Sequence, residues 1–205
     1  NESKVRGRTY RKKVCKIKFY DIIETLSRKN DWLVKKMLKR LCPRFQIKYL
    51  ADLDPNFLLE RGLKGLMLDL DNTLVAWGEY NVSSEMITWV HKMKKAGLKL
   101  CIISNALEQR VRIVGEILDI PWVSQAIKPR KSAFKRALEI LDTKPSETAT
   151  VGDQLFTDIW GGNRMALFTI WTTPLSAREL LFTKFVRYFE RKVVKMLRKK
   201  GIICE

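Results

Sequence analysis

Residues 64–74 read Lys-Gly-Leu-Met-Leu-Asp-Leu-Asp-Asn-Thr-Leu, and this stretch decides the fold. Its apolar part is short and does not alternate with polar residues, which is typical of a strand buried on both faces of a parallel sheet. Two acids, Asp69 and Asp71, end the run. Burying a carboxylate costs free energy unless the group is paired or bound to a metal. The stretch therefore predicts a buried strand that ends at a polar functional site.

Strands and helices alternate in the sequence around this stretch. The expected strands are short apolar runs, and the expected helices carry apolar residues three and four positions apart. Such alternation predicts an α/β protein with a doubly wound, Rossmann-like parallel sheet that is covered by helices on both faces. The expected strands are 64–70, 98–104, 123–127, 148–152 and 167–172, and the expected helices are 56–61, 84–96, 107–118, 132–141 and 155–165.

The charge of the chain is large and unevenly distributed. The 205 residues carry 40 Lys and Arg against 22 Asp and Glu, a formal net charge of +18. Residues 62–174 are nearly balanced, with 14 basic and 12 acidic side chains. Residues 1–61 have 17 and 7, and residues 175–205 have 9 and 3. A basic excess of this size points to a polyanionic partner, either a nucleic acid or an anionic membrane surface.

The division of charge suggests three segments. They are a basic and partly disordered N-terminal extension over 1–36, a catalytic domain over 37–175 and a basic amphipathic helix over 176–205. Another basic helix is expected over 31–42 and stops at Pro43. In residues 178–200 large apolar side chains, including Phe185 and Phe189, recur every four positions. This last helix can lie in the headgroup plane of a membrane, or it can pack against the sheet with its basic groups in solvent.

Cysteine content and hydropathy bear on the compartment. The four cysteines form no CxxC pair, so neither a zinc site nor a disulfide framework is expected, and a reducing cytoplasm fits. They are Cys15, Cys42, Cys101 and Cys204. No stretch of 18 uncharged apolar residues occurs, so no transmembrane helix is expected.

Polar residues follow the ends of four expected strands, where parallel sheets place their chemistry. Carboxylate oxygens are hard ligands that suit Mg²⁺. Asp69 can act as ligand and nucleophile, and Asp71 can protonate a leaving alkoxide and then deprotonate the attacking water. Lys128 can neutralise charge, and Ser104 can donate to a phosphoryl oxygen. The candidates are catalytic Asp69, Asp71 and Lys128, substrate-binding Thr73, Ser104 and Asn105, and metal-binding Asp69, Asp153 and Asp158.

These residues resemble the four motifs of the haloacid dehalogenase superfamily of phosphatases. The matching features are DxDxT at 69–73, the serine at Ser104, the lysine at Lys128 and GDxxxxD at 152–158. The resemblance implies a Rossmann-like sheet, dependence on Mg²⁺ and a covalent aspartyl-phosphate. It also implies Asp69 as the nucleophile, and Asp71 as the acid and base whose backbone carbonyl is a metal ligand.

The spacing of the motifs leaves no room for a cap domain. Asp71 and Ser104 are 33 positions apart, and Ser104 and Lys128 are 24 apart. The site is therefore expected to be open, which suits a substrate whose phosphate belongs to a lipid headgroup, a nucleic-acid end or a protein side chain. Residues 41–43, 62–74 and 152–158 resemble the YqeG-type class III phosphatases, which are similar to mitochondrial and plastid phosphatidylglycerophosphate phosphatases.

The narrower resemblance extends from about Met37 to about Leu175. It implies hydrolysis of phosphatidylglycerophosphate to phosphatidylglycerol. The basic arms fit this on independent grounds, since they can attach the protein peripherally to the inner face of a membrane. The implied partners are a phospholipid headgroup and an anionic membrane surface.

Other interpretations stay open at this point. A soluble phosphatase could act on nucleotide, nucleic-acid-end or protein phosphates, with the basic arms holding a polyanion. A third possibility is a non-catalytic protein associated with the ribosome or with nucleic acid, although a binding module needs neither nucleophile nor acid. Ser104 and Asp158 could simply cap turns. His91, the single histidine, is expected at the surface. The sequence indicates no oligomeric state.

Overall fold

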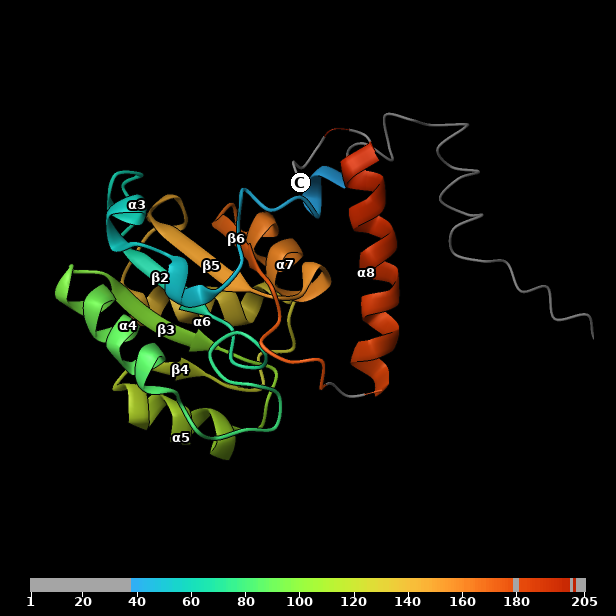
Figure 1. The fold of residues 1–205 in the computed structure, drawn as a ribbon. Helices are drawn as coiled ribbons and strands as arrows, with labels where there is room; N and C mark the ends of the chain where they lie inside the picture. Colours follow the sequence, from blue (N-terminus) through green and yellow to red (C-terminus); the bar gives the residue numbers. More distant parts are fainter. Residues whose placement is uncertain (1–37, 179–180, 200, 202–205) are drawn as a thin grey trace, which may run out of the picture. The chain divides into compact units, whose positions relative to one another are not determined.

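Six parallel strands form the centre of the structure, a computed structural model that describes residues 38–178, 181–199 and 201. The strands are hydrogen-bonded in the order β1-β6-β5-β2-β3-β4, and every neighbouring pair is parallel. The strands are β1 (Phe45–Ile47), β2 (Gly65–Leu68), β3 (Lys99–Ile103), β4 (Trp122–Val123), β5 (Thr148–Gly152) and β6 (Phe168–Thr172). The predicted parallel sheet is thereby confirmed (Figure 1).

Helices cover both faces of this sheet. From β2 the chain runs outward to β3 and β4 through α4 and α5, and it returns to β5 and β6 through α6 and α7. Because crossovers between parallel strands are right-handed, the outward and returning helices lie on opposite faces (Figure 1). The helices are α3 (Pro55–Leu59), α4 (Ser84–Lys95), α5 (Glu108–Leu118), α6 (Lys131–Leu141), α7 (Trp160–Arg164) and α8 (Leu181–Lys199).

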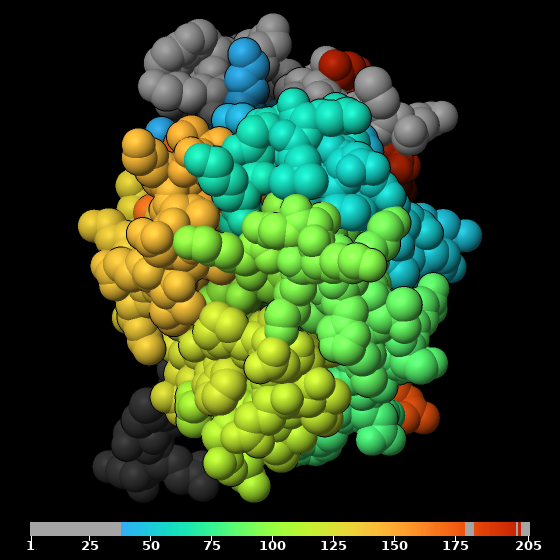
Figure 2. Space-filling view, turned by 90° about the vertical axis from the view of Figure 1, so that its left-hand side faces the viewer, coloured from blue at the N-terminus to red at the C-terminus, as the bar shows by residue number. Residues whose placement is uncertain are grey.

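Side chains of the central strands alternate between two apolar clusters. In β2, Leu66 and Leu68 join the cluster that contains residues of α4 and α5, whereas Met67 joins the cluster that contains residues of α6. Strand β3 alternates in the same way. All four residues of β2 are buried, which explains why its sequence shows no polar alternation. Figure 2 shows the surface that α3, α4 and α5 form on the side away from α8.

No separate domain interrupts the motifs. Between β2 and β3 the chain holds one connecting segment and α4, and between β3 and β4 it holds α5 and two short turns. Every residue of both intervals lies in the described part of the chain. The prediction of a capless fold is therefore confirmed.

Three elements differ from the sequence-based expectation. Strand β1 was not expected, yet it pairs with β6 at the edge of the sheet. The strand expected over 123–127 is only two residues long, because Gln125 and Ile127 have φ angles of 44° and 50°, which an extended strand cannot include. The helix expected over 155–165 begins as a π-helical turn, Leu155–Ile159, and continues as α7.

The terminal segments are described only in part. The extension expected over 1–36 lies outside the described residues, as does most of the helix expected over 31–42, of which residues 38–40 are helical. At the other end, α8 buries Arg187 and Glu190 and exposes Phe185 and Tyr188. Among the helices in the described ranges, none is both long and apolar enough to cross a membrane.

Candidate active site

Lys128 joins three segments at the carboxyl edge of the sheet. Its ammonium Nζ lies 2.5 Å from Asp69 Oδ1 and 2.6 Å from Asp158 Oδ1, and it donates to the carbonyl of Ile103 at 2.9 Å. Asp69 follows β2, and its backbone N–H donates to the carbonyl of Val151 in β5 at 3.0 Å. The neighbouring strands therefore hold the expected nucleophile beside the expected lysine.

Burial changes the titration of this group of side chains. Burial alone would lower the pKa of Lys128, but the carboxylates of Asp158 and Asp69 outweigh it and raise that pKa. The lysine is therefore a permanent cation. Burial also raises the pKa of Asp69 to about 7, because the Lys128 ammonium only partly offsets the lost hydration and the repulsion from Asp158. Any added positive charge next to Asp69 would favour its ionised, nucleophilic form.

Asp158 has a double role in the π-helical turn. Its Oδ2 accepts the N–H of Gln154 at 3.2 Å and the hydroxyl of Thr157 at 3.3 Å, while its Oδ1 binds Lys128. A Cβ at Gly152 would lie 2.3 Å from Asp158 Cγ, so only glycine leaves room for this carboxylate over the end of β5. Asp158 therefore stabilises the turn through Oδ2 and belongs to the site through Oδ1.

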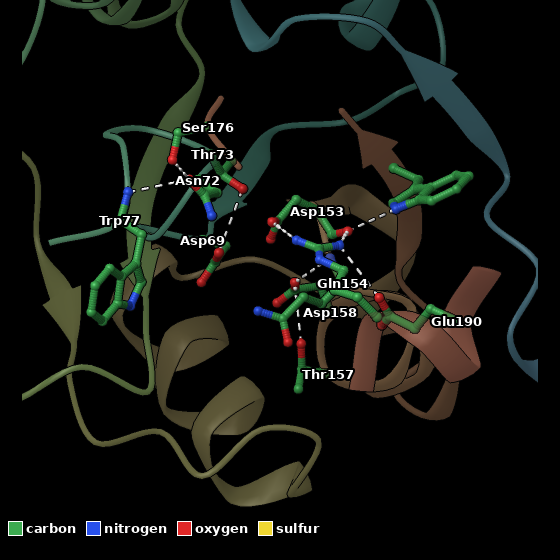
Figure 3. Close-up of polar contacts among 12 residues, drawn as sticks. Asp69, Asn72, Thr73, Trp77, Asp153, Gln154, Thr157, Asp158, Ser176 and Glu190 are labelled. Carbon is green, nitrogen blue, oxygen red and sulfur yellow. Dashed lines mark hydrogen bonds and ion pairs between the residues drawn. The ribbon is translucent and has the colours of Figure 1, made fainter. Parts of the chain in front are cut away.

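Asp153 lies completely buried between the site and α8 (Figure 3). Its Oδ2 forms an ion pair with the guanidinium of Arg187, and Arg187 also donates to its backbone carbonyl. Oδ1 has no hydrogen-bond partner among the described residues. Burial raises the pKa of Asp153, opposed by Arg187. An unpartnered buried carboxylate oxygen implies a further ligand.

The donor set fits a divalent cation. Carboxylate oxygens of Asp69, Asp153 and Asp158 lie within 4.8 Å of one another. Ion pairs at the site bring together five carboxylates and three cations, so the negative charges would exceed the positive ones by two if every carboxylate were ionised. The carboxylates are Asp69, Asp71, Asp153, Asp158 and Glu190, and the cations are Arg110, Lys128 and Arg187. A hard divalent ion such as Mg²⁺ matches both the oxygen ligands and the missing charge.

Asp71 is held from the side by α5. The guanidinium of Arg110 forms an ion pair with Asp71 Oδ1 and donates to the carbonyls of Glu79 at 2.9 Å and Ala76 at 3.4 Å. Asp71 keeps 22% of its side chain exposed, so it can reach solvent and a leaving group. Sequence reasoning did not identify Arg110, which belongs to no motif and lies 39 positions from its partner.

The three expected substrate-binding residues have local partners. Thr73 Oγ1 lies 3.5 Å from Asp69 Oδ2. Ser104 Oγ accepts the N–H of Ala106 at 3.1 Å, which leaves its hydrogen free to donate. Asn105 Oδ1 accepts the backbone N–H of Lys128 at 2.7 Å and thereby positions the loop that carries the lysine. The Ser104 hydroxyl can therefore serve a phosphoryl group, whereas the Thr73 hydroxyl donates to Asp69 and the Asn105 carbonyl supports Lys128.

Two charged residues of α8 were also missed as parts of the site. Arg187 binds Asp153, and Glu190 accepts the N–H of Phe156 at 3.1 Å and pairs with Arg187 at 3.3 Å. The sequence pattern placed Arg187 among the solvated basic positions of an amphipathic helix. A weak signal was present, since an arginine and a glutamate three positions apart can pair with each other on one face of a helix.

Two known proteins are similar to this chain in sequence. The chain is 39% identical over 168 residues to "Probable phosphatase YqeG" of Bacillus subtilis (strain 168), covering 82% of this chain and 98% of that protein. It is 26% identical over 180 residues to "Phosphatidylglycerophosphate phosphatase 1, chloroplastic/mitochondrial" of Arabidopsis thaliana, covering 83% of this chain and 52% of that protein.

A solved structure and a family model complete the comparison. An uncharacterised protein from Listeria monocytogenes serotype 4b has 21% identity and a TM-score of 0.48, over 58% of this chain and 85% of that chain. The family model of haloacid dehalogenase-like hydrolases matches residues 43–165. The chain therefore belongs to the haloacid dehalogenase-like hydrolases, and its activity is that of a phosphatase of this family.

Proposed function

We propose that this protein is a Mg²⁺-dependent phosphomonoesterase that removes the terminal phosphate of phosphatidylglycerophosphate at a membrane surface. The observation that carries the proposal is the buried contact of Asp69, Lys128 and Asp158 next to the unpartnered oxygen of Asp153. A module that only binds phosphate has no need to bury several acids at its centre, because they repel that ligand.

Asp69 is the nucleophile in this proposal. Lys128 holds Oδ1, whereas Oδ2 has only the 3.5 Å contact with Thr73 among the described residues. Oδ2 attacks the phosphorus, the bond from phosphorus to the ester oxygen breaks, and Asp71 gives its proton to the departing alkoxide. The product of this half-reaction is an aspartyl-phosphate on Asp69.

The second half-reaction returns the enzyme to its starting state. Asp71 takes a proton from water, the water oxygen attacks the phosphorus, and the bond to Asp69 breaks to release inorganic phosphate. Lys128 and the Ser104 hydroxyl stabilise the phosphoryl oxygens throughout. Asp69, Asp153 and the carbonyl of Asp71 would hold a Mg²⁺ ion, with Asp158 as a supporting carboxylate. The ion would supply charge neutralisation for the phosphate.

Three features support a lipid headgroup as the substrate. The chain resembles a protein named phosphatidylglycerophosphate phosphatase over most of its length. The capless fold leaves the site open to a phosphate carried on a large molecule. Close to the site, α8 exposes 61% of Phe185 and 49% of Tyr188, and Lys192 lies over the Tyr188 ring at 4.3 Å. Exposed aromatic side chains among basic ones are typical of helices that lie in the headgroup region.

A panel of substrates with Mg²⁺ tests this proposal. It compares phosphatidylglycerophosphate in mixed micelles with a nucleoside monophosphate, a 5′-phosphorylated oligonucleotide and a phosphopeptide, with phosphate release as the measurement. We expect kcat/KM to be highest for the lipid by at least about tenfold, and activity to vanish with chelator. A higher value for any other compound would assign the protein to the soluble phosphatases instead. No release from any of them would favour the non-catalytic alternative.

A further inference from the structure

A cleft of about 370 Å³ lies between α8 and the segment that leads to it from β6. Its lining residues in the described part of the chain are Pro174, Ser176, Ala177, Lys184, Arg187 and Arg191. Three of these six residues are basic and none is acidic. The cleft therefore has the charge of an anion-binding site.

Two walls of the cleft connect it to the catalytic residues. On one wall, the Ser176 hydroxyl donates to Asn72 Oδ1 at 3.0 Å, and Asn72 directly follows Asp71 in the sequence. On the other wall, Arg187 binds the carboxylate of Asp153. Figure 3 shows Ser176 beside Asn72, and Asp153 between the site and Glu190 of α8. The cleft thus borders the reaction site.

Lys184 and Arg191 are the cations that the cleft offers to a ligand. They lie three positions before and four positions after Arg187, so all three share one face of α8. Both side chains are exposed, and neither pairs with a carboxylate among the described residues. Arg187 is paired with Asp153 and Glu190. Lys184 and Arg191, by contrast, are two cations at one cleft that repel each other, and an anion bound between them would remove that repulsion.

We propose that this cleft is a second anion subsite, which binds a phosphodiester group of the substrate while the phosphomonoester lies at Asp69. The inference rests on the proposed function and deepens it. The ligand class is a phosphomonoester and a phosphodiester joined by a short polyol, a chemistry that a lipid headgroup and its deacylated, soluble form share. Lys184 and Arg191 form charge-assisted hydrogen bonds to the diester oxygens. Without a cap domain, this subsite gives the open site a means of selecting its substrate.

Steady-state kinetics on two soluble compounds test the subsite. Glycerophosphoglycerophosphate carries both phosphates, and glycerol 3-phosphate carries the monoester alone. For the double variant Lys184→Ala/Arg191→Ala, we expect the ratio of the two kcat/KM values to fall by about tenfold or more, chiefly through a higher KM for the larger compound. Lys195→Ala is the matched control, since Lys195 is exposed on α8 but does not line the cleft. An unchanged ratio in the double variant, or the same fall in the control, would overturn the proposal.

A binding measurement separates the subsite from the catalytic proposal. Glycerophosphoglycerol has the diester but no monoester, so calorimetry measures its affinity without turnover. We expect the double variant to bind it about tenfold more weakly than the unmodified chain. Equal affinities would refute the subsite even if the protein hydrolyses phosphomonoesters, and a lack of hydrolysis would refute the proposed function even if this difference is found.

The long-chain lipid in mixed micelles shows where the two basic side chains act. A similar fall in kcat/KM for the micellar lipid and for the deacylated headgroup supports binding of the headgroup in the cleft. A fall that occurs only with micelles would show that Lys184 and Arg191 attract the anionic surface, and it would overturn the subsite.

Discussion

Asp69 combines two properties that a nucleophilic carboxylate needs. It is 5% exposed, and Lys128 fixes one of its oxygens, which leaves the other to react. In the variant Asp69→Asn, the amide has nearly the same shape but cannot form an acyl phosphate, so we expect kcat for phosphate release to fall by at least about 10³-fold. Asp142→Asn is the control, because that carboxylate is 94% exposed and lies outside the site. Retention of most of the activity in Asp69→Asn would refute its assignment as nucleophile.

Gly152 determines whether Asp158 can occupy its place. Since a Cβ at this position would lie 2.3 Å from Asp158 Cγ, Gly152→Ala must displace a carboxylate that is bound to Lys128. We expect the free energy of unfolding to fall by about 1–3 kcal/mol and Mg²⁺ affinity, measured by calorimetry, to fall by about tenfold or more.

A second glycine separates these two effects of Gly152→Ala. A Cβ at Gly115 would lie 2.4 Å from a ring carbon of Trp122 and 3.1 Å from the carbonyl oxygen of Ile120, and neither residue belongs to the site. We expect Gly115→Ala to lower stability while Mg²⁺ affinity is retained. If both variants lose affinity equally, the role of Gly152 is general packing and not the placement of Asp158.

The motif residues could be predicted from the sequence, but most of their partners could not. Asp69 and Asp153 follow apolar strands at the same edge of a parallel sheet, and strand order alone brings them together. The partners Arg110 and Arg187 lie on helices, where a basic residue is usually solvated and its sequence context does not show which way it points. Tertiary packing decides whether such a side chain points to solvent or to the site, and no local pattern in a single sequence shows the direction.

At the scale of elements, the spacing of apolar residues predicted the bounds of helices and strands best where an element is long or fully buried. The fully buried β5 and the helices α4, α5 and α6 lie within about a residue of their expected bounds. The edge strand β1 is only three residues long and half-buried. Residues 44–49 alternate between polar and apolar side chains, as a half-buried strand does, so this strand could have been predicted from its sequence. The π-helical turn, Leu155–Ile159, shares its composition with an ordinary helix, and the bonds of Asp158 distinguish it only in three dimensions.

The sequence of α8 left open whether the helix packs against the domain or lies on a membrane, and the structure answers the first part of this question. The buried Arg187 and Glu190 bind the domain, whereas Phe185 and Tyr188 remain exposed. Packing against the domain therefore uses other side chains of the helix than those that the proposed membrane contact would use. Two exposed rings, Phe185 and Tyr188, remain after the helix has packed, and the half-buried ring of Phe189 lies 4.9 Å from that of Phe185 between centroids.

The exposed aromatics of α8 provide a direct test of membrane contact. We expect Phe185→Ser/Tyr188→Ser to weaken binding to vesicles of phosphatidylglycerol and phosphatidylcholine by roughly tenfold or more, since burying each ring contributes about 1.5–3 kcal/mol. Sedimentation of protein with vesicles measures this. Leu107→Ser is the control, because Leu107 is 71% exposed but lies just before α5. Equal binding by both variants and the unmodified chain would exclude this contact.

At the scale of the whole molecule, the two signs of charge are separated. The net charge of +18 belongs mainly to the terminal segments, whereas the ion-paired core of the site has more carboxylates than cations. A phosphorylated surface would thus attract the outside of the molecule, but the phosphate would meet repulsion from the acids at the site. A bound cation would supply the missing positive charge, so we expect the proposed metal to be needed for binding as well as for catalysis.

This charge balance predicts that Mg²⁺ stabilises the folded chain. An ion that binds the native state only, at a hundred times its Kd, adds about 2.7 kcal/mol to the free energy of unfolding, which raises Tm by roughly 5–10 °C. The effect should be greater at pH 8 than at pH 6, because the pKa of Asp69 is raised to about 7 in the metal-free protein. Without the ion, Asp69 favours folding below the unfolded pKa near 4, and this contribution is lost as the pH rises through about 7.

Thermal unfolding at both pH values, with Mg²⁺ or with chelator, measures this stabilisation. Asp153→Asn removes the carboxylate whose oxygen lacks a partner, so it should abolish most of the shift in Tm at either pH. Asp142→Asn, at an exposed position, should keep the full shift and its dependence on pH. A shift of equal size in Asp153→Asn would mean that Mg²⁺ binds elsewhere, and an equal shift at pH 6 and pH 8 would mean that it does not compete with protons for Asp69. Either result would contradict a site built on these buried acids.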